Sequence, residues 1–345
     1  AYITIRSIIF KIISIILLLV LVKKPEDYLI YTAITVFSAV GSNLLNFIHA
    51  RNFVHIRLTT NTNLKHHLKP ILIIFASAIA VTIYVSSDTT ILGLLKNDYA
   101  VGIYSTSVKI YQIAQSLLSA LLTVTIPRLA FLWGQRRIGE YNQVLSKVVD
   151  SLGILVLPAA VGLIMLSREV VLIIASEKYL PSVNSLRIIS WAIIFSIFAW
   201  IFSDCVLIPA KRENLVLRNT IITAIENIIL NFILIPFMSY DGTALSTVLA
   251  EFTVMIMNGY SCRDIIKPVI FKKDTLKNLL DSIIGCIGIV VICLLCDIGF
   301  KSLWLKTIFS VVLSVIMYGA VLILLKNKNA YSMLDRAKMI LKSKL

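Results

Sequence analysis

The chain has few of the residues with which enzymes and metal proteins carry out their chemistry. It contains 4 histidines and 18 acidic residues in 345, and charged residues make up 15% of it. The histidines, at positions 49, 55, 66 and 67, show no metal-ligand spacing supported by carboxylates. A Gly-rich phosphate loop and a Gly-x-Ser-x-Gly motif are also missing. We therefore expect no catalytic residue, no metal site and no cofactor, and the sequence predicts that the protein is not an enzyme.

The 5 cysteines are equally uninformative about chemistry. They lie in or beside apolar stretches, at positions 205, 262, 286, 293 and 296. Cys293 and Cys296 have the C-x-x-C spacing of redox and metal motifs, but they fall within an apolar segment without a nearby histidine. Cysteines in such surroundings behave as small apolar side chains, so we expect neither a disulfide framework nor a redox site.

Long apolar stretches are what the chain has in abundance. Hydrophobic residues make up 58% of the sequence and the mean hydropathy is +0.90. The stretches are each about 20 residues long, which matches the hydrocarbon core of a bilayer, and about ten can be distinguished. They cover residues 7–22, 28–50, 70–87, 101–126, 148–167, 184–208, 214–236, 242–260, 279–296 and 302–325. The predicted fold is all-α, a polytopic membrane helix bundle with almost no chain left for a soluble domain.

The distribution of basic residues predicts how these spans are oriented. A net charge of +15 is typical of nucleic-acid-binding proteins, but here Lys and Arg gather in every second connection between spans. The basic segments are 51–69, 128–147, 209–218, 262–277 and the tail 326–345. This alternation follows the positive-inside rule and places the beginning of the chain and its tail in the cytoplasm. It argues against a nucleic-acid partner and in favour of contacts with anionic membrane lipids.

Four segments are expected along the chain. Residues 1–69 form a helical hairpin followed by a basic linker, and residues 70–262 form a six-helix lobe. Residues 263–325 add two further spans, and residues 326–345 form a basic amphipathic tail along the membrane surface. No small-residue cleavage site follows the first apolar stretch, so we do not interpret it as a signal peptide.

The span 101–126 carries the most informative pattern. We expect its helix to open at Val101 and to end at Pro127 and Arg128. Its polar residues recur every three or four positions, at Ser105, Lys109, Gln112, Ser116, Ser119 and Thr123. Such spacing places them on one helix face, and a charged polar face at membrane depth must meet protein or water. The stripe therefore predicts a water-accessible path, with Asp88 and Arg128 as candidate gate residues near its two ends.

Two carboxylates in neighbouring spans are candidates for ion coupling. Glu226 lies in the middle of span 214–236 and Glu251 in the middle of span 242–260, and a short turn joins the two. Both would lie near the bilayer midplane, where like charges in close proximity raise a pKa. Together with Asp88 they are candidates to bind a proton or a coupling cation. The alternative is that they are neutral carboxyl groups that hydrogen-bond two helices together. A further acid, Asp204, is expected to be solvated or to pair with Lys211 or Arg212.

The order of short motifs resembles a known family. The relevant residues are Tyr84, Asp88, Ile91-Leu92-Gly93, Val101-Gly102-Ile103-Tyr104, Lys109, Pro127-Arg128-Leu129, Pro158, Tyr179-Leu180-Pro181 and Asp241-Gly242-Thr243-Ala244. This pattern resembles the flippases of polysaccharide repeat units, such as O-antigen, capsular and teichoic-type units. These belong to a superfamily that also contains multidrug extruders and the lipid II flippase.

The resemblance implies a two-lobed transporter of about 12 to 14 helices that works by alternating access. On this basis, about four spans would precede the present chain. The substrate would be an undecaprenyl-pyrophosphate-linked oligosaccharide crossing the bacterial cytoplasmic membrane. The cavity residues would be Lys109, Ser105, Gln112, Ser116 and Arg128. A polysaccharide polymerase and chain-length proteins are candidate partners.

Two other functions remain open. A drug–cation antiporter of the same superfamily would favour an acidic, aromatic cavity, whereas Lys109 is cationic. A membrane-embedded polysaccharide polymerase or glycosyltransferase would need a large outer loop or acidic residues in such a loop, and the predicted outer loops are short.

Overall fold

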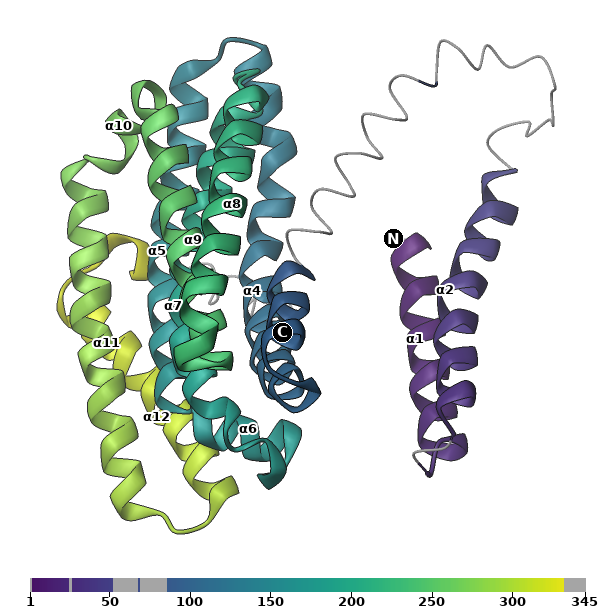
Figure 1. The fold of residues 1–345 in the computed structure, drawn as a ribbon. Helices are drawn as coiled ribbons and strands as arrows, with labels where there is room; N and C mark the ends of the chain where they lie inside the picture. Colours follow the sequence, from purple (N-terminus) through teal and green to yellow (C-terminus); the bar gives the residue numbers. More distant parts are fainter. Residues whose placement is uncertain (1, 25–26, 52–67, 69–85, 332–345) are drawn as a thin grey trace, which may run out of the picture. The chain divides into compact units, whose positions relative to one another are not determined.

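The computed structural model of the protein describes residues 2–24, 27–51, 68 and 86–331, and within these ranges the regular structure is entirely helical (Figure 1). The chain divides into two compact units, Ala1–Ala76 and Ser77–Leu345. Most of the predicted span 70–87, most of the linker 51–69 and most of the tail 326–345 lie outside the described residues.

The first unit contains a helical hairpin. Helices α1 (Tyr2–Leu21) and α2 (Tyr28–Ala50) pack along each other, with the rings of Phe10 and Phe37 5.6 Å apart. Asp27 closes the turn between them, because its Oδ2 accepts hydrogen bonds from the backbone N–H groups of Lys23 and Lys24, at 2.9 and 3.0 Å. These backbone donors lower the pKa of Asp27, so the turn keeps a charged carboxylate at neutral pH.

The second unit is a bundle of long helices with short connecting elements. Residues 86–95 are helical, and the later elements follow in chain order. They are α4 (Asp98–Gly134), α5 (Ile138–Met165), α6 (Ser167–Ala175), the 3₁₀ turn η2 (Glu177–Tyr179), α7 (Ser182–Trp200), the π-helical segment η3 (Ile201–Leu207), α8 (Glu213–Met238), α9 (Tyr240–Ser261), α10 (Arg263–Ile270), α11 (Lys273–Gly299) and α12 (Leu303–Leu324).

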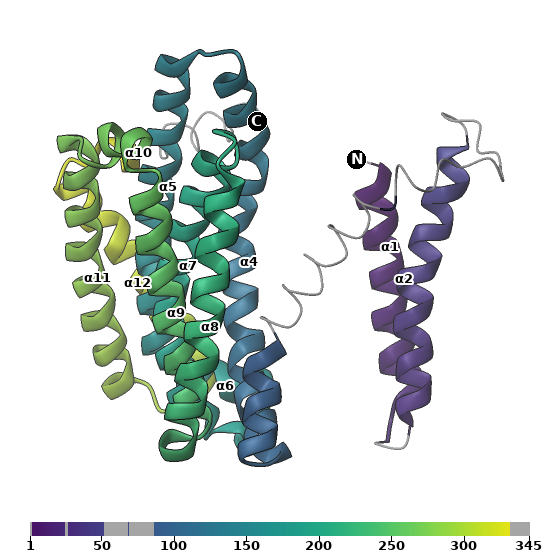
Figure 2. The ribbon, with the colours of Figure 1, turned by 45° about the horizontal axis from the view of Figure 1, so that its top comes forward.

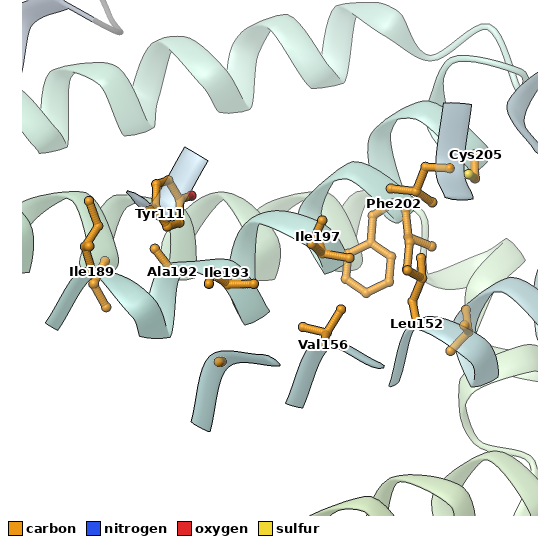
Figure 3. Packing of buried hydrophobic residues seen from close by; sticks show 14 of the residues in the cluster. Tyr111, Leu152, Val156, Ile189, Ala192, Ile193, Ile197, Phe202 and Cys205 are labelled. Carbon is orange, nitrogen blue, oxygen red and sulfur yellow. The ribbon is translucent and has the colours of Figure 1, made fainter. Parts of the chain in front are cut away.

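Helix α7 forms the centre of this bundle. It packs against α4, α5 and α9, and its buried residues include Ile189, Ala192, Ile193 and Ile197. Figure 3 shows these side chains beside Tyr111 of α4 and Leu152 and Val156 of α5. A helix that is apolar on all sides belongs in the interior, which explains this position. Helix α11 packs against α5 and α12, and Figure 2 shows α11 at the edge of the unit.

The helices confirm the predicted class of fold. Seven helices in the described part of the chain are long and apolar enough to cross a membrane, namely α2, α4, α5, α7 with η3, α8, α11 and α12. Helix α1 contributes a shorter apolar stretch, Ile8–Leu21. Helix α9 also covers a predicted span, at residues 240–261. The protein is therefore an all-α, polytopic membrane helix bundle.

One predicted boundary is wrong. Helix α4 does not end at Pro127 and Arg128 but continues to Gly134, and α5 begins at Ile138, about ten residues before the predicted span. A proline removes one hydrogen bond from a helix, but tertiary packing can compensate within a membrane bundle. Here Leu129 and Leu132 are buried beyond the proline, and the ring of Trp133 contacts that of Tyr141 at 4.9 Å.

A close approach of two backbones fixes the turn between α8 and α9. Ser239 adopts a positive φ of 52°, and its carbonyl accepts a hydrogen bond from the N–H of Gly242 at 3.0 Å. A Cβ atom on Gly242 would lie 2.7 Å from the carbonyl oxygen of Leu234. The glycine therefore lets α9 begin directly against the last turn of α8.

We expect Gly242→Ala to lower the free energy of unfolding by about 1–3 kcal/mol, the usual cost of overpacking. The change would push α8 and α9 apart at their joint. The measurement is the midpoint of thermal unfolding of the purified protein in detergent. Gly319→Ala is the matched control, because a Cβ there meets nothing within 4 Å. Equal midpoints for the two variants would contradict this reading of the turn.

Candidate functional site

Asp88 accepts hydrogen bonds from three other helices. Its Oδ2 accepts from the hydroxyl of Tyr104 on α4, at 3.0 Å, and from Oγ1 of Thr247 on α9, at 2.8 Å. Its Oδ1 accepts from Nδ2 of Asn231 on α8, at 2.7 Å. A single carboxylate thus joins residues 86–95 to α4, α8 and α9.

A second layer of hydrogen bonds holds Asn231 in place. Its Nδ2 also donates to Oδ1 of Asn227 at 3.1 Å, and its Oδ1 accepts from Oγ of Ser246 at 2.8 Å. On α8, polar residues at every fourth position share one face, and all are at most 2% exposed. They are Asn219, Thr223, Asn227 and Asn231. Because buried polar groups in a membrane must be paired, this face turns toward α9 and Asp88 rather than toward lipid.

The chemistry of the cluster suits a small cation or a proton. Asp88 forms no ion pair with any described residue, so no side-chain cation there balances its charge. The oxygens of Asp88, Asn227 and Thr247 are hard ligands of the kind that Na⁺ and other hard cations prefer. Groups of three or more His, Cys, Asp or Glu residues are not found within the described ranges, which speaks against a transition-metal site there.

A cavity of about 430 Å³ adjoins the cluster. Its lining includes acidic, aromatic and polar residues, among them Asp88, Tyr104, Tyr111, Gln112, Gln115, Trp200, Ser203, Val216, Thr220, Thr247, Glu251 and Asn258. The residues Thr247 and Asn258 lie on α9, separated by about 16 Å of helix at 1.5 Å per residue. The cavity therefore extends from Asp88 toward the end of the bundle where α8 begins and α9 finishes.

The cavity brings together two of the three predicted coupling-ion residues. Asp88 and Glu251 both line it. Glu226 does not belong to its lining, and its Oε1 accepts a hydrogen bond from Oγ1 of Thr253 at 2.9 Å. Glu226 and Glu251 thus have different surroundings, although they lie on neighbouring helices.

Helix α4 has three distinct faces. One is buried in the bundle and contains Ile103, Tyr104, Ser107 and Tyr111. A second is apolar and exposed, with Leu117 72% and Val124 81% exposed. The polar stripe of Ser105, Lys109, Gln112 and Ser116 lies on the side of the helix away from the buried face, and Lys109 is about 80° around the helix from Leu117. The polar stripe thus borders the apolar face that suits lipid.

The remaining cavity candidates have the following surroundings. Lys109 is exposed and forms no ion pair with a described residue, and Arg128 is exposed. Ser105 is partly exposed, and Ser116 donates from Oγ to the carbonyl of Ile113 in its own helix at 2.8 Å. Of the stripe, Gln112 alone lines the cavity within the described part of the chain.

The expected pairing of Asp204 with Lys211 or Arg212 is wrong. Oδ1 of Asp204 accepts from Oγ of Ser203 at 3.1 Å, whereas Arg212 pairs with Asp264. Asp204 lies in the π-helical segment η3, which continues α7. Arg212 comes after the turn that follows η3, and its guanidinium reaches Asp264 on α10.

The fold is similar to that of a solved membrane protein. The structure matches a solved structure of the lipid II flippase MurJ in an inward closed conformation, with a TM-score of 0.67 and 18% identity. The match covers 92% of this chain and 66% of that one. Since the identity is low, this likeness establishes the fold alone.

Sequence comparisons match part of the chain to a family. Residues 1–133 match the family described as polysaccharide biosynthesis protein. A Shigella dysenteriae protein assigned as an O-antigen transporter is 23% identical over 256 residues, which is 74% of this chain and 64% of that protein. The chain thus spans just under two thirds of the length of these relatives. The sequence comparisons confirm the resemblance to polysaccharide flippases, and the Shigella dysenteriae relative is described as a transporter rather than an enzyme.

Proposed function

We propose that the protein is a flippase that moves an undecaprenyl-pyrophosphate-linked oligosaccharide repeat unit across the bacterial cytoplasmic membrane by alternating access. Support comes from the MurJ-like fold and from the similarity to the Shigella dysenteriae O-antigen transporter. In this proposal residues 1–69 end one lobe, residues 70–262 form the second lobe and residues 263–325 add two peripheral spans.

The polar stripe of α4 is the observation that carries this proposal. An exposed lysine on a polar stripe of a membrane helix is costly unless it meets water, protein or an anion. A substrate pyrophosphate supplies such an anion, and a charge-assisted contact with Lys109 would bind it strongly. Ser105, Gln112, Ser116 and Arg128 would line the same path.

The Asp88 cluster would couple transport to a cation or proton. Binding there would join four helices, and release would open them, so the ion could bias one conformation of the lobe over another. Glu251 would be a second residue in the cavity that binds the ion. Because the cavity extends toward the end with the basic connections, the ion would leave on the cytoplasmic side. The beginning of the chain and its tail would lie on that side as well.

The test is complementation of a bacterial strain that lacks its own repeat-unit flippase. Expression of the protein is expected to restore surface polysaccharide and to clear the lipid-linked repeat unit that accumulates in the cytoplasmic leaflet. A polysaccharide polymerase and chain-length proteins of the same strain would then act on the flipped unit. Normal expression without any surface polysaccharide, in strains with several different repeat units, would contradict the proposal.

One observation favours a second function, that of a drug–cation antiporter. The cavity is both acidic and aromatic, with Asp88 and Glu251 beside Tyr104, Tyr111 and Trp200. Organic cations bind well in such surroundings. Resistance of the expressing cells to tetraphenylphosphonium, without recovery of surface polysaccharide, would favour this alternative over a flippase.

A further inference from the structure

Helix α10 lies across one end of the second unit and has two different faces. It connects the end of α9 to the start of α11, as Figures 1 and 2 show. Ile266 and Val269, three positions apart, are 4% and 0% exposed and belong to the main apolar core. The other face exposes Arg263, Asp264 and Lys267. The short helix is thus anchored by its apolar side and presents charge outward.

The one acidic residue on this face is already paired. Asp264 receives two parallel hydrogen bonds from Arg212, from Nη1 to Oδ1 at 2.8 Å and from Nη2 to Oδ2 at 2.7 Å. Arg212 also donates to the carbonyl of Ser261 at 3.3 Å. These bonds from Arg212 keep the pKa of Asp264 below its ordinary value, so the carboxylate stays ionised and occupied. It is not available to neutralise the other basic residues of α10.

Four further basic residues lie around α10 and form no ion pair with a described acidic residue. They are Arg218, Arg263, Lys267 and Lys272. They line two hollows of about 430 and 320 Å³. Arg263 and Asp264 take part in both linings, so the hollows lie next to each other at these residues. We call this surface the α10 shelf.

Exposed aromatic rings flank the α10 shelf. Tyr260, which precedes α10 in the chain, is 68% exposed, and Phe271, which follows it, is 66% exposed. The guanidinium of Arg263 stacks over the Tyr260 ring at 4.0 Å, which holds its N–H groups in a fixed plane. Aromatic rings beside basic residues at the end of membrane-spanning helices are typical of the headgroup region.

We propose that the α10 shelf binds the phosphate headgroup of an anionic phospholipid. Its excess positive charge matches a phosphodiester, and Arg263 offers the planar donor geometry that phosphate accepts. The acyl chains would extend along exposed apolar residues of the two adjoining helices, such as Ile256 of α9 and Leu280 of α11. A soluble phosphate would gain nothing from these residues. The site lies outside the Asp88 cavity, and the proposal does not depend on the protein being a flippase.

The test compares lipid binding by the purified protein and by Arg263→Gln combined with Lys267→Gln. The probe is phosphatidylglycerol in nanodiscs of otherwise zwitterionic lipid, with binding followed by native mass spectrometry and by thermal stabilisation. Each basic residue near an anionic surface contributes about 1 kcal/mol, which is a factor of about 5.4 in affinity. We therefore expect the loss of two residues to lower the affinity for phosphatidylglycerol about 30-fold. The variant should unfold at the wild-type temperature in zwitterionic lipid, since both side chains are exposed.

A charge-matched control is Arg168→Gln combined with Lys178→Gln, two exposed basic residues in α6 and η2. It should keep at least half of the wild-type affinity. Equal losses in the two double variants would overturn the proposal, because net charge alone would then explain binding. Equal stabilisation of the wild type by inorganic phosphate or pyrophosphate would also overturn it, because the acyl chains would then contribute nothing. If the shelf variant is less stable in zwitterionic lipid, Lys267→Gln combined with Lys272→Gln repeats the comparison.

Discussion

Asp88→Asn is expected to abolish cation coupling while leaving the fold intact. Asparagine has nearly the same shape as aspartate, and its Oδ1 can still accept hydrogen bonds from Tyr104 and Thr247. The bond from Asn231 is lost, but Nδ2 of Asn231 keeps its other acceptor, Oδ1 of Asn227. The negative charge that would bind a cation is lost, and a charged hydrogen-bonding contact contributes about 1.5–3 kcal/mol. Cation affinity should therefore fall at least about tenfold, since 1.4 kcal/mol corresponds to a factor of ten. Isothermal titration of the purified protein with Na⁺, at fixed ionic strength and at several pH values, measures it.

Two matched variants sharpen this prediction. Glu226→Gln removes a carboxylate that lies outside the cavity lining, so cation affinity should remain close to that of the wild type. Glu251→Gln removes a carboxylate of the lining and should have an intermediate effect. If neither the affinity nor its pH dependence changes in Asp88→Asn, Asp88 is a neutral structural carboxyl and the coupling proposal fails.

Lys109→Ala is expected to abolish surface polysaccharide at a near-normal protein level. Lys109 is exposed and forms no ion pair with a described residue, so its loss leaves no buried charge without a partner. The expected defect lies in substrate binding, at least about tenfold, from a charge-assisted contact of about 1.5–3 kcal/mol. Lys109→Arg keeps the charge and should retain partial activity. Surface polysaccharide and membrane abundance are measured together in the complementation strain.

The control for Lys109 is Lys178→Ala, which removes an exposed lysine from η2 rather than from the stripe. It should leave surface polysaccharide unchanged. Full activity of Lys109→Ala would exclude a role in pyrophosphate binding. A parallel loss of protein and activity in both Lys109→Ala and Lys109→Arg would instead indicate that this position stabilises the helix.

The sequence was sufficient for the class of fold because hydropathy and helix length are local properties. Apolar stretches such as 184–208 and 214–236 coincide with α7–η3 and α8 to within a few residues. The ends of α4 and α5 were not predictable in this way, because Pro127 normally limits a helix and only the burial of Leu129 and Leu132 extends it. Prediction of a helix end requires knowledge of what packs against it.

The candidate site could be predicted in part. Asp88 and Glu251 stood out because carboxylates at membrane depth are rare, but their meeting in one cavity depends on how α4, α8 and α9 pack. The partners of Asp88, namely Tyr104, Asn231 and Thr247, were not assigned to it from the sequence. A signal was present, since Asn219, Thr223, Asn227 and Asn231 recur every four residues. Their regular spacing indicated that this face of α8 contacts another polar helix, but not which carboxylate would accept a hydrogen bond from it.

Our central proposal is that this bundle flips a lipid-linked oligosaccharide, and that the gradient of a cation or proton that binds at Asp88 drives the process. The most direct measurement is the flipping of a fluorescent undecaprenyl-pyrophosphate-linked oligosaccharide in proteoliposomes, with and without an imposed Na⁺ or proton gradient. We expect one of the two gradients to accelerate flipping by the wild-type protein, and we expect Asp88→Asn to retain no gradient-dependent rate. A wild-type rate that neither gradient alters, or an Asp88→Asn protein that responds to the gradient like the wild type, would contradict the proposal.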